Sequence, residues 1–169
     1  KDTFTVIDEF FNNVDNYHWY KETIDSFKTV FAKEHSEYSV KNLIVVSGSS
    51  RTALGLLGFH CSFNEVVTCD LSWNYEHCFP STKIIPLTDE FELDVYGICN
   101  TAEILKMKNE LNGQRTAVIL NNPHNASGKI FREKDLKDIL EQVLNKGIFV
   151  IDDLAYQNVL PDDSLNGPK

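Results

Sequence analysis

Short apolar runs alternate with longer amphipathic stretches along this chain. Five of the runs are rich in β-branched residues, which favour strands. They comprise residues 42–46, 64–70, 82–87, 115–121 and 147–153. Strands separated by helical stretches are typical of βαβ units, in which helices join parallel strands. The pattern therefore predicts an α/β fold, a three-layer sandwich around a mainly parallel sheet.

The amphipathic stretches predict helices between these strands. In the clearest one, from Arg132 to Lys146, apolar residues recur at helical spacing, and Gly147 follows as a C-terminal stop. Those apolar residues are Leu136, Ile139, Leu140, Val143 and Leu144. A second helix is predicted from about Tyr20 to His35. Its apolar face would carry Ile24, Phe27 and Phe31.

The composition limits the classes of function and the expected organisation. The 169 residues include 16 basic and 25 acidic ones, and this net charge of −9 disfavours binding to nucleic acid or to an anionic membrane surface. The sequence contains no apolar run of about 18 residues and does not start like a secretory signal, so the expected compartment is the cytoplasm. We expect a main domain over residues 20–160, an N-terminal segment over 1–19 and a loop or truncated end over 161–169.

The cysteines and histidines do not predict a metal site. The four cysteines, Cys61, Cys69, Cys78 and Cys99, form no CxxC pair, and no histidine lies near them at zinc-ligand spacing. Two disulfides would also suit an even count. In a cytosolic chain, buried free thiols are the expected state.

Three strand ends are unusual and could bind a ligand. In an open α/β sheet, ligands bind at the carboxyl ends of the strands. The run 42–46 leads into Ser49, Ser50 and Arg51, which open a helix where backbone N–H groups could hold an anion. Simple capping of that helix by Ser49 or Ser50 is the alternative.

The last predicted strand ends in two carboxylates. Strand alternation places Asp153 on the same face as Ile151, and Asp152 on the opposite face, so only one aspartate can point toward a site. Alternatively, both acids cap the following turn in solvent. Trp73 lies just beyond the 64–70 strand, where a lone tryptophan is more often a core residue than a platform for a ligand.

The stretch NNPHNASGKIF, from Asn121 to Phe131, follows another strand end and is rich in side-chain amides. Together with SGSSR, Trp73 and VIDDLAY, taken in this order, it resembles the large domain of the class I/II aminotransferases, the fold-type I enzymes that use pyridoxal 5′-phosphate. The resemblance covers about residues 20–159, so the main domain would be a partial cofactor-binding large domain.

The resemblance implies a role for each matching residue. Asn125 would donate a hydrogen bond to the phenolic oxygen of the cofactor, and Tyr156 would share that oxygen. Asp153 would pair with the protonated pyridine nitrogen and so keep the ring an electron sink. Trp73 would stack on the ring face. Ser49, Ser50 and Arg51 would form the phosphate-binding turn, although the position of Arg51 is usually small or polar in the family.

The chain also departs from the family pattern. Ala126 and Ser127 replace the usual Pro-Thr after the asparagine. The Schiff-base lysine of the family lies well beyond the Asp-x-x-Tyr motif, and no residue of this chain matches it. The phosphate-binding arginine and the small domain that follow it have no match either. We therefore expect a chain without catalytic residues of its own, inactive alone, from a parent enzyme that acts on an amino acid and a 2-oxo acid.

Other functions remain open at this stage. Lyases and synthases of the same fold type share these cofactor residues, and a non-catalytic remnant could keep the fold for binding or dimerisation. The family forms homodimers, so the resemblance implies a homodimeric parent. A nucleotide-binding doubly wound domain ranks last, because SGSSRT does not supply a Gly-x-Gly-x-x-Gly turn.

Overall fold

The computed structural model describes residues 16–157, with side chains from Tyr20 onward. The chain divides into two compact units between Ser47 and Gly48. The segment bounds expected from the sequence, 1–19, 20–160 and 161–169, stay a prediction, because their outer parts lie outside the described residues.

The first unit contains helix α2 (Asn16–Glu34) and the short 3-10 helix η1 (Val40–Asn42). The helix predicted from Tyr20 to His35 is confirmed, and its Phe31 ring stacks on His35 with centroids 4.4 Å apart. The strand predicted at 42–46 is wrong. A strand needs a hydrogen-bonded neighbour, and the described residues give this segment none. Ile44 is 85% exposed as a result.

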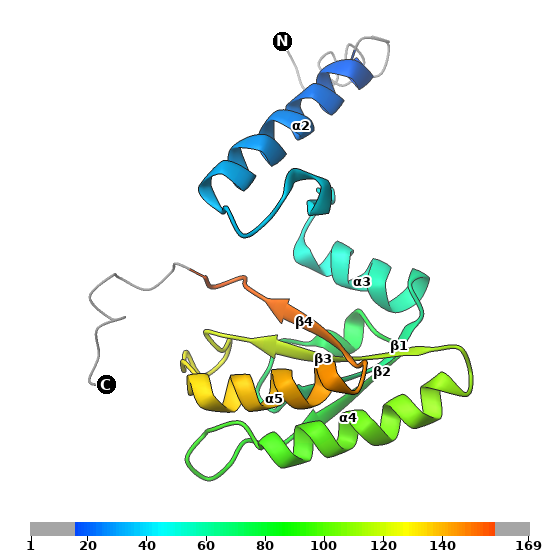
Figure 1. The fold of residues 1–169 in the computed structure, drawn as a ribbon, viewed down its shortest axis with the longest axis vertical. Coiled ribbons are helices and arrows are strands. Elements are labelled where there is room, and N and C mark those ends of the chain that lie inside the picture. The colour runs from blue at the N-terminus through cyan, green and yellow to red at the C-terminus, as the bar shows by residue number, and fades with distance from the viewer. Residues whose placement is uncertain (1–15, 158–169) are drawn as a thin grey trace, which may run out of the picture. The chain divides into compact units, whose positions relative to one another are not determined.

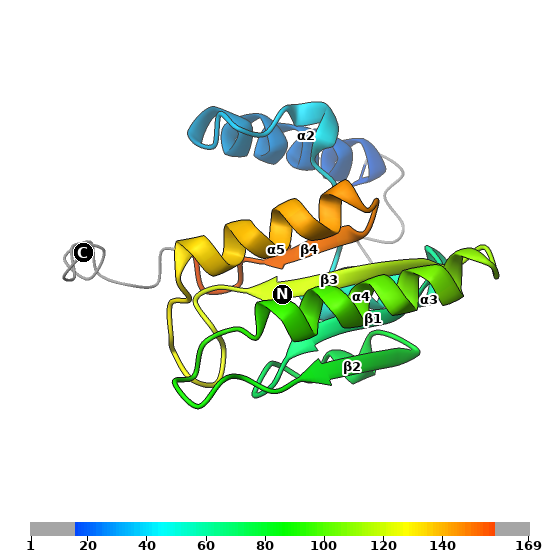
Figure 2. The ribbon, with the colours of Figure 1, turned by 60° about the horizontal axis from the view of Figure 1, so that its bottom comes forward.

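The second unit is built on one parallel sheet (Figures 1 and 2). Its strands are β1 (Phe63–Cys69), β2 (Ser81–Ile85), β3 (Arg115–Asn121) and β4 (Phe149–Asp153), in the order β2-β1-β3-β4. Its helices are α3 (Ser50–His60), η2 (Tyr75–His77), α4 (Val95–Glu110) and α5 (Glu133–Asn145). Four of the five predicted strands are therefore confirmed, and β2 ends before Pro86, which lacks the N–H that would continue the ladder.

Helices cover both faces of this sheet and form three layers. Helices α4 and α5 pack on the face that carries Val67 and Val118, in a core that includes Ile139 of α5. Helix α3 and the segment around η2 pack on the opposite face. The predicted α/β sandwich is confirmed.

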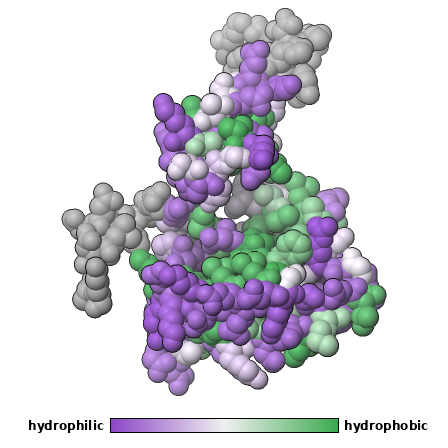
Figure 3. Space-filling model, viewed as in Figure 1, coloured by the Kyte–Doolittle hydropathy of each residue, from purple (hydrophilic) through white to green (hydrophobic). Residues whose placement is uncertain are grey.

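Helix α5 follows its sequence pattern closely. Ile139 and Val143 are buried, as is Asp135 of the first turn, whereas most of the other charged residues are exposed and form the hydrophilic band over α5 in Figure 3. The helix ends before Gly147, whose φ of +68° is a left-handed conformation that glycine adopts without strain. The predicted helix and its stop are both confirmed.

Several expectations from composition can be compared with the described residues. The four cysteines are free thiols; Cys69, Cys78 and Cys99 are buried, whereas Cys61 is exposed, so the expectation of burial was wrong for Cys61. Within residues 16–157, no helix is long and apolar enough to cross a membrane. The same residues hold no cluster of metal-ligating side chains.

Two glycines of α3 give a matched test of the packing of this helix on the sheet. A Cβ atom at Gly58 would lie 2.0 Å from the backbone oxygen of Cys78, whereas a Cβ atom at Gly55 would meet no atom within 4 Å. We expect Gly58→Ala to lower the free energy of unfolding by about 3 kcal/mol or more, because a backbone atom cannot yield easily. Gly55→Ala should raise it by about 0.5–1 kcal/mol, because alanine is the better helix former.

Urea unfolding of the purified chain, followed by circular dichroism, measures both changes. Equal effects of the two substitutions would contradict the close approach of α3 to the Cys78 segment.

Candidate functional site

The seven residues singled out from the sequence lie around one pocket of about 340 Å³. Its lining consists of Ser49, Ser50, Arg51, Trp73, Asn125, Asp153, Ala155 and Tyr156. The pocket lies at the carboxyl ends of β3 and β4, on the face covered by α3. These residues come from four separate segments, and parallel strands bring them together because their carboxyl ends meet at one edge.

The N-terminus of α3 contributes one wall. Ser49 occupies the N-cap position with extended backbone dihedrals, yet its side chain makes no capping hydrogen bond. Capping by this hydroxyl, the alternative considered from the sequence, is therefore not found. The hydroxyl lines the pocket together with that of Ser50, beside a helix end whose first N–H groups favour an anion.

Arg51 and Trp73 form a second wall. The guanidinium carbon of Arg51 lies 5.1 Å from the centroid of the Trp73 ring, which is a cation–π contact. Trp73 is partly buried: it packs against the apolar residues on the α3 side of the sheet and also lines the pocket. Its ring meets Tyr75 edge to face, with centroids 5.5 Å apart. A positive charge and a flat aromatic surface therefore lie next to each other in the pocket.

The two aspartates that end β4 point to opposite faces of the sheet, as predicted. Ile151 packs with the residues on the α3 side, and Asp153 follows it into the pocket. Asp152 lines a separate hollow with Leu140 on the α5 side. Although Asp152 is exposed overall, partial desolvation of its carboxylate, followed by the nearby charge of Asp153, raises its pKa.

A buried tyrosine that sequence analysis did not single out orients the Asp153 carboxylate. The hydroxyl of Tyr75 donates a hydrogen bond to Oδ2 of Asp153 at 2.7 Å, and the N–H of Ala155 donates to Oδ1 at 3.2 Å. Burial, followed by the contact with Asp153, raises the pKa of Tyr75, so its hydroxyl stays protonated and remains a donor. Its position two residues after Trp73 was the only signal in the sequence.

A second polar residue that was missed, Asn121, joins the two sides of the pocket. Its Oδ1 accepts the backbone N–H of Asn125 at 2.8 Å, and its Nδ2 donates to the backbone oxygen of Asp153 at 2.8 Å. Asn121 is buried at the end of β3. The sequence shows the run of amides, but this contact depends on which strand lies beside β3, and local sequence does not indicate that neighbour.

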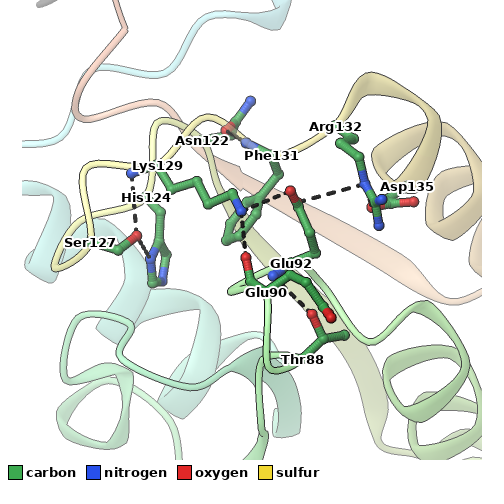
Figure 4. A network of polar contacts seen from close by, with 10 residues as sticks. All are labelled: Thr88, Glu90, Glu92, Asn122, His124, Ser127, Lys129, Phe131, Arg132 and Asp135. Carbon is green, nitrogen blue, oxygen red and sulfur yellow. Dashed lines mark hydrogen bonds and ion pairs between the residues drawn. The ribbon is translucent and has the colours of Figure 1, made fainter.

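The loop from Asn122 to Phe131, which carries Asn125, closes around a buried histidine (Figure 4). Nδ1 of His124 lies 2.7 Å from the Ser127 hydroxyl, which also accepts the N–H of Lys129 at 3.2 Å. The Ser127 hydroxyl thus contacts both the ring and the backbone of its own loop. Burial lowers the pKa of His124, in agreement with a neutral ring. Ser127 thus closes the loop where the family pattern has Pro-Thr.

The same loop is tied to the segment that precedes α4 (Figure 4). Nζ of Lys129 lies 2.7 Å from Oε1 of the largely buried Glu92, and it donates to the backbone oxygen of Glu90 at 2.8 Å. At the far end of the loop, Oδ1 of Asn122 accepts the N–H of Phe131 at 2.9 Å. Because both ends and the middle are held, the backbone of Asn125 has a defined position.

The groups around the pocket suit one kind of ligand. A cation and a helix N-terminus can hold an anionic group, an indole ring can stack on a flat ring, and a fixed carboxylate can accept a cationic N–H. The amide of Asn125 and the hydroxyl of Tyr156 can donate to an oxygen. No described residue around the pocket is a lysine.

Comparisons with known proteins agree with the fold. The family model "Aminotransferase class I and II" matches residues 11–167. A Saccharomyces cerevisiae protein described as a kynurenine–oxoglutarate transaminase is 24% identical over 139 residues, which cover 77% of this chain and 31% of the relative. A histidinol-phosphate aminotransferase of Haemophilus influenzae is 34% identical over 84 residues, 50% of this chain and 21% of the relative.

A solved structure has the same arrangement of elements. The N-succinyldiaminopimelate aminotransferase of Mycobacterium tuberculosis superposes with a TM-score of 0.60 at 20% identity, over 77% of this chain and 35% of that one. The chain thus spans only about a fifth to a third of the length of these relatives. The family model matches nearly the whole chain, and it confirms the resemblance found in the sequence. The chain belongs to the class I and II aminotransferases.

Proposed function

We propose that this chain forms the noncovalent part of a pyridoxal 5′-phosphate site in an aminotransferase. The observation that carries the proposal is the convergence of Asp153, Asn125, Trp73 and the α3 N-terminus on one pocket. When bound, this cofactor supplies an electron sink for the bonds at the Cα atom of an amino acid. The residues of the pocket bind and orient it.

The phosphate would lie at the α3 N-terminus. Ser49 and Ser50 offer hydroxyls there, and the Ser49 side chain is not used in capping the helix. Arg51 adds a positive charge from the same turn. A guanidinium beside backbone N–H groups suits a phosphate dianion, because each contact is charge-assisted.

The ring would stack on Trp73. Its pyridinium N–H and its phenolic oxygen would contact different residues of the pocket. Asp153 would accept the N–H of the pyridinium, and Tyr75 holds the carboxylate in place for this contact by donating to Oδ2. Asn125 and Tyr156 would donate to the phenolic oxygen. These contacts fix which way round the ring lies in the pocket.

The whole protein is proposed to transfer an amino group between an amino acid and a 2-oxo acid, as a cytoplasmic homodimer. The names of its relatives, a transaminase and an aminotransferase, support this reaction, and the chain spans 31% and 21% of their lengths. No described residue of the pocket is a lysine that could attach the cofactor. We therefore propose that residues 1–169 alone bind the cofactor reversibly and do not catalyse transamination.

Binding can be measured with pyridoxamine 5′-phosphate, which has no aldehyde and cannot react with surface lysines. With Trp19→Phe as background, Trp73 is the remaining tryptophan, and its fluorescence should be quenched as the ligand stacks on it. We expect Asp153→Asn to raise the dissociation constant about tenfold or more, because a charge-assisted hydrogen bond contributes about 1.5–3 kcal/mol.

Asp152→Asn is the matched control, because Asp152 has the same chemistry and faces the other side of the sheet. It should leave the dissociation constant unchanged within about twofold. Equal effects of the two substitutions, or no quenching of Trp73, would contradict the proposed site.

Since none of the described residues that line the pocket is a lysine, a second outcome is expected. After incubation with pyridoxal 5′-phosphate and reduction with borohydride, mass spectrometry should find low labelling spread over several surface lysines. Transamination should be no faster than with free cofactor. In the family, the lysine that attaches the cofactor also transfers the proton, and such general acid–base catalysis contributes about 10²–10⁴-fold. Stoichiometric labelling of one lysine with turnover above that rate would contradict the proposal.

A further inference from the structure

We propose that Asn121 is a positioning residue that fixes the spacing between Asn125 and Asp153, so that both can reach one ligand. This inference rests on the proposed function, because it assigns those two residues to opposite ends of the same ring. Asn121 does not line the pocket, so it would act through its two neighbours.

The position of Asn121 explains how one side chain reaches both residues. β3 and β4 are parallel neighbours, and Asn121 is paired in register with Asp153 at the last position of each strand. The ladder stops there, and the amide of Asn121 continues the link from β3 to β4 through Nδ2 and the Asp153 oxygen, at 2.8 Å. Its Oδ1 accepts the N–H of Asn125, four residues later, also at 2.8 Å.

The contacts require a short amide at this position. One end of the side chain must donate and the other must accept, and among short side chains only asparagine does both from a planar group. An aspartate could still accept the Asn125 N–H, but it would direct a carboxylate toward the Asp153 oxygen. Since Asn121 is only 4% exposed, water cannot replace a lost partner.

The link matters because the two contacts must act on one rigid ring. The Glu92–Lys129 ion pair ties the Asn125 loop to the segment before α4, whereas Asn121 ties it to β4, which carries Asp153. Without Asn121, the Glu92–Lys129 ion pair would still hold the loop, but the distance between Asn125 and Asp153 would be free to change. A displacement of about 1 Å at a polar contact is enough to cost a large factor in binding or rate.

Asn109 offers a matched control for the loss of a buried asparagine. It is 1% exposed, and its Nδ2 donates to Thr116 Oγ1 at 2.8 Å on the α4 side of the sheet, where it does not line the pocket. We expect both Asn121→Ala and Asn109→Ala to lower the urea midpoint, Asn109→Ala by less, because the Asn109 side chain makes one described hydrogen bond and that of Asn121 makes two. Only Asn121→Ala should raise the dissociation constant of pyridoxamine 5′-phosphate, by about tenfold. This substitution alone removes the link that fixes the distance between Asn125 and Asp153.

A double substitution separates positioning from general destabilisation. Asn125→Ala should weaken ligand binding in the unsubstituted background and in Asn109→Ala. In Asn121→Ala it should have little further effect, because the Asn125 amide would no longer be held where the ligand needs it. Full additivity of Asn121→Ala and Asn125→Ala would overturn the proposal. If Asn121→Ala does not fold, the isosteric Asn121→Asp takes its place, with the same weakened ligand binding expected.

Hydrogen exchange tests the link without any ligand. The Asn125 amide should exchange faster in Asn121→Ala by at least about tenfold more than amides in the centre of β3, and Asn109→Ala should not produce this difference. Unchanged exchange at Asn125 would overturn the role of Asn121 whatever the ligand. By contrast, failure of the unsubstituted chain to bind pyridoxamine 5′-phosphate, with fast exchange in Asn121→Ala, would overturn the proposed function and leave Asn121 as the anchor of this loop.

Discussion

The parallel pairing of β3 with β4 is the constraint on which the rest of the site depends. It brings two strand ends to the same edge of the sheet, with Asn121 opposite Asp153. Because side chains alternate along a strand, the register that buries Val150 on the α5 side also turns Asp153 toward α3. A shift of one residue would exchange Asp153 for Asp152 and turn the pocket's carboxylate to the wrong face.

Polar groups, rather than apolar packing, give the carboxyl edge its order. Tyr75, Asn121 and His124 are all buried there, and each has a polar contact with a different segment: Tyr75 and Asn121 with Asp153, and His124 with Ser72. A buried polar group without a partner costs about 1–3 kcal/mol, so each of these contacts constrains where its partners can lie. The strands determine which segments meet at the carboxyl edge. The polar side chains determine where Asp153 and Asn125 lie at that edge.

Much of this could be predicted from the sequence, and the failures share one physical reason. The local pattern predicted α5 and four strands, and alternation predicted that the two aspartates face opposite sides of the sheet, because both depend on local geometry. The choice of Asp153 came from the family resemblance. The run 42–46 has the composition of a strand, but a strand exists only with a partner. Tyr75 lies 78 residues from Asp153 in the sequence, and no local pattern indicates such a contact. The burial of Cys61 was likewise mispredicted, since burial depends on what covers a residue.

The charges of the pocket give it a direction. Arg51 and the N-terminus of α3 bring positive potential to one wall, and the Asp153 carboxylate brings negative charge to another, with the Trp73 ring also lining the space. A flat ligand with an anion at one end and a cationic N–H at the other can satisfy both charges in one orientation only, since the reverse places like charges together. The chain as a whole carries a net charge of −9, so the positive charge of Arg51 in the pocket is opposite in sign to that of the whole chain. Charge would thus decide the orientation of such a ligand. Hydrogen bonds from Asn125 and Tyr156 would then add to its binding in that orientation.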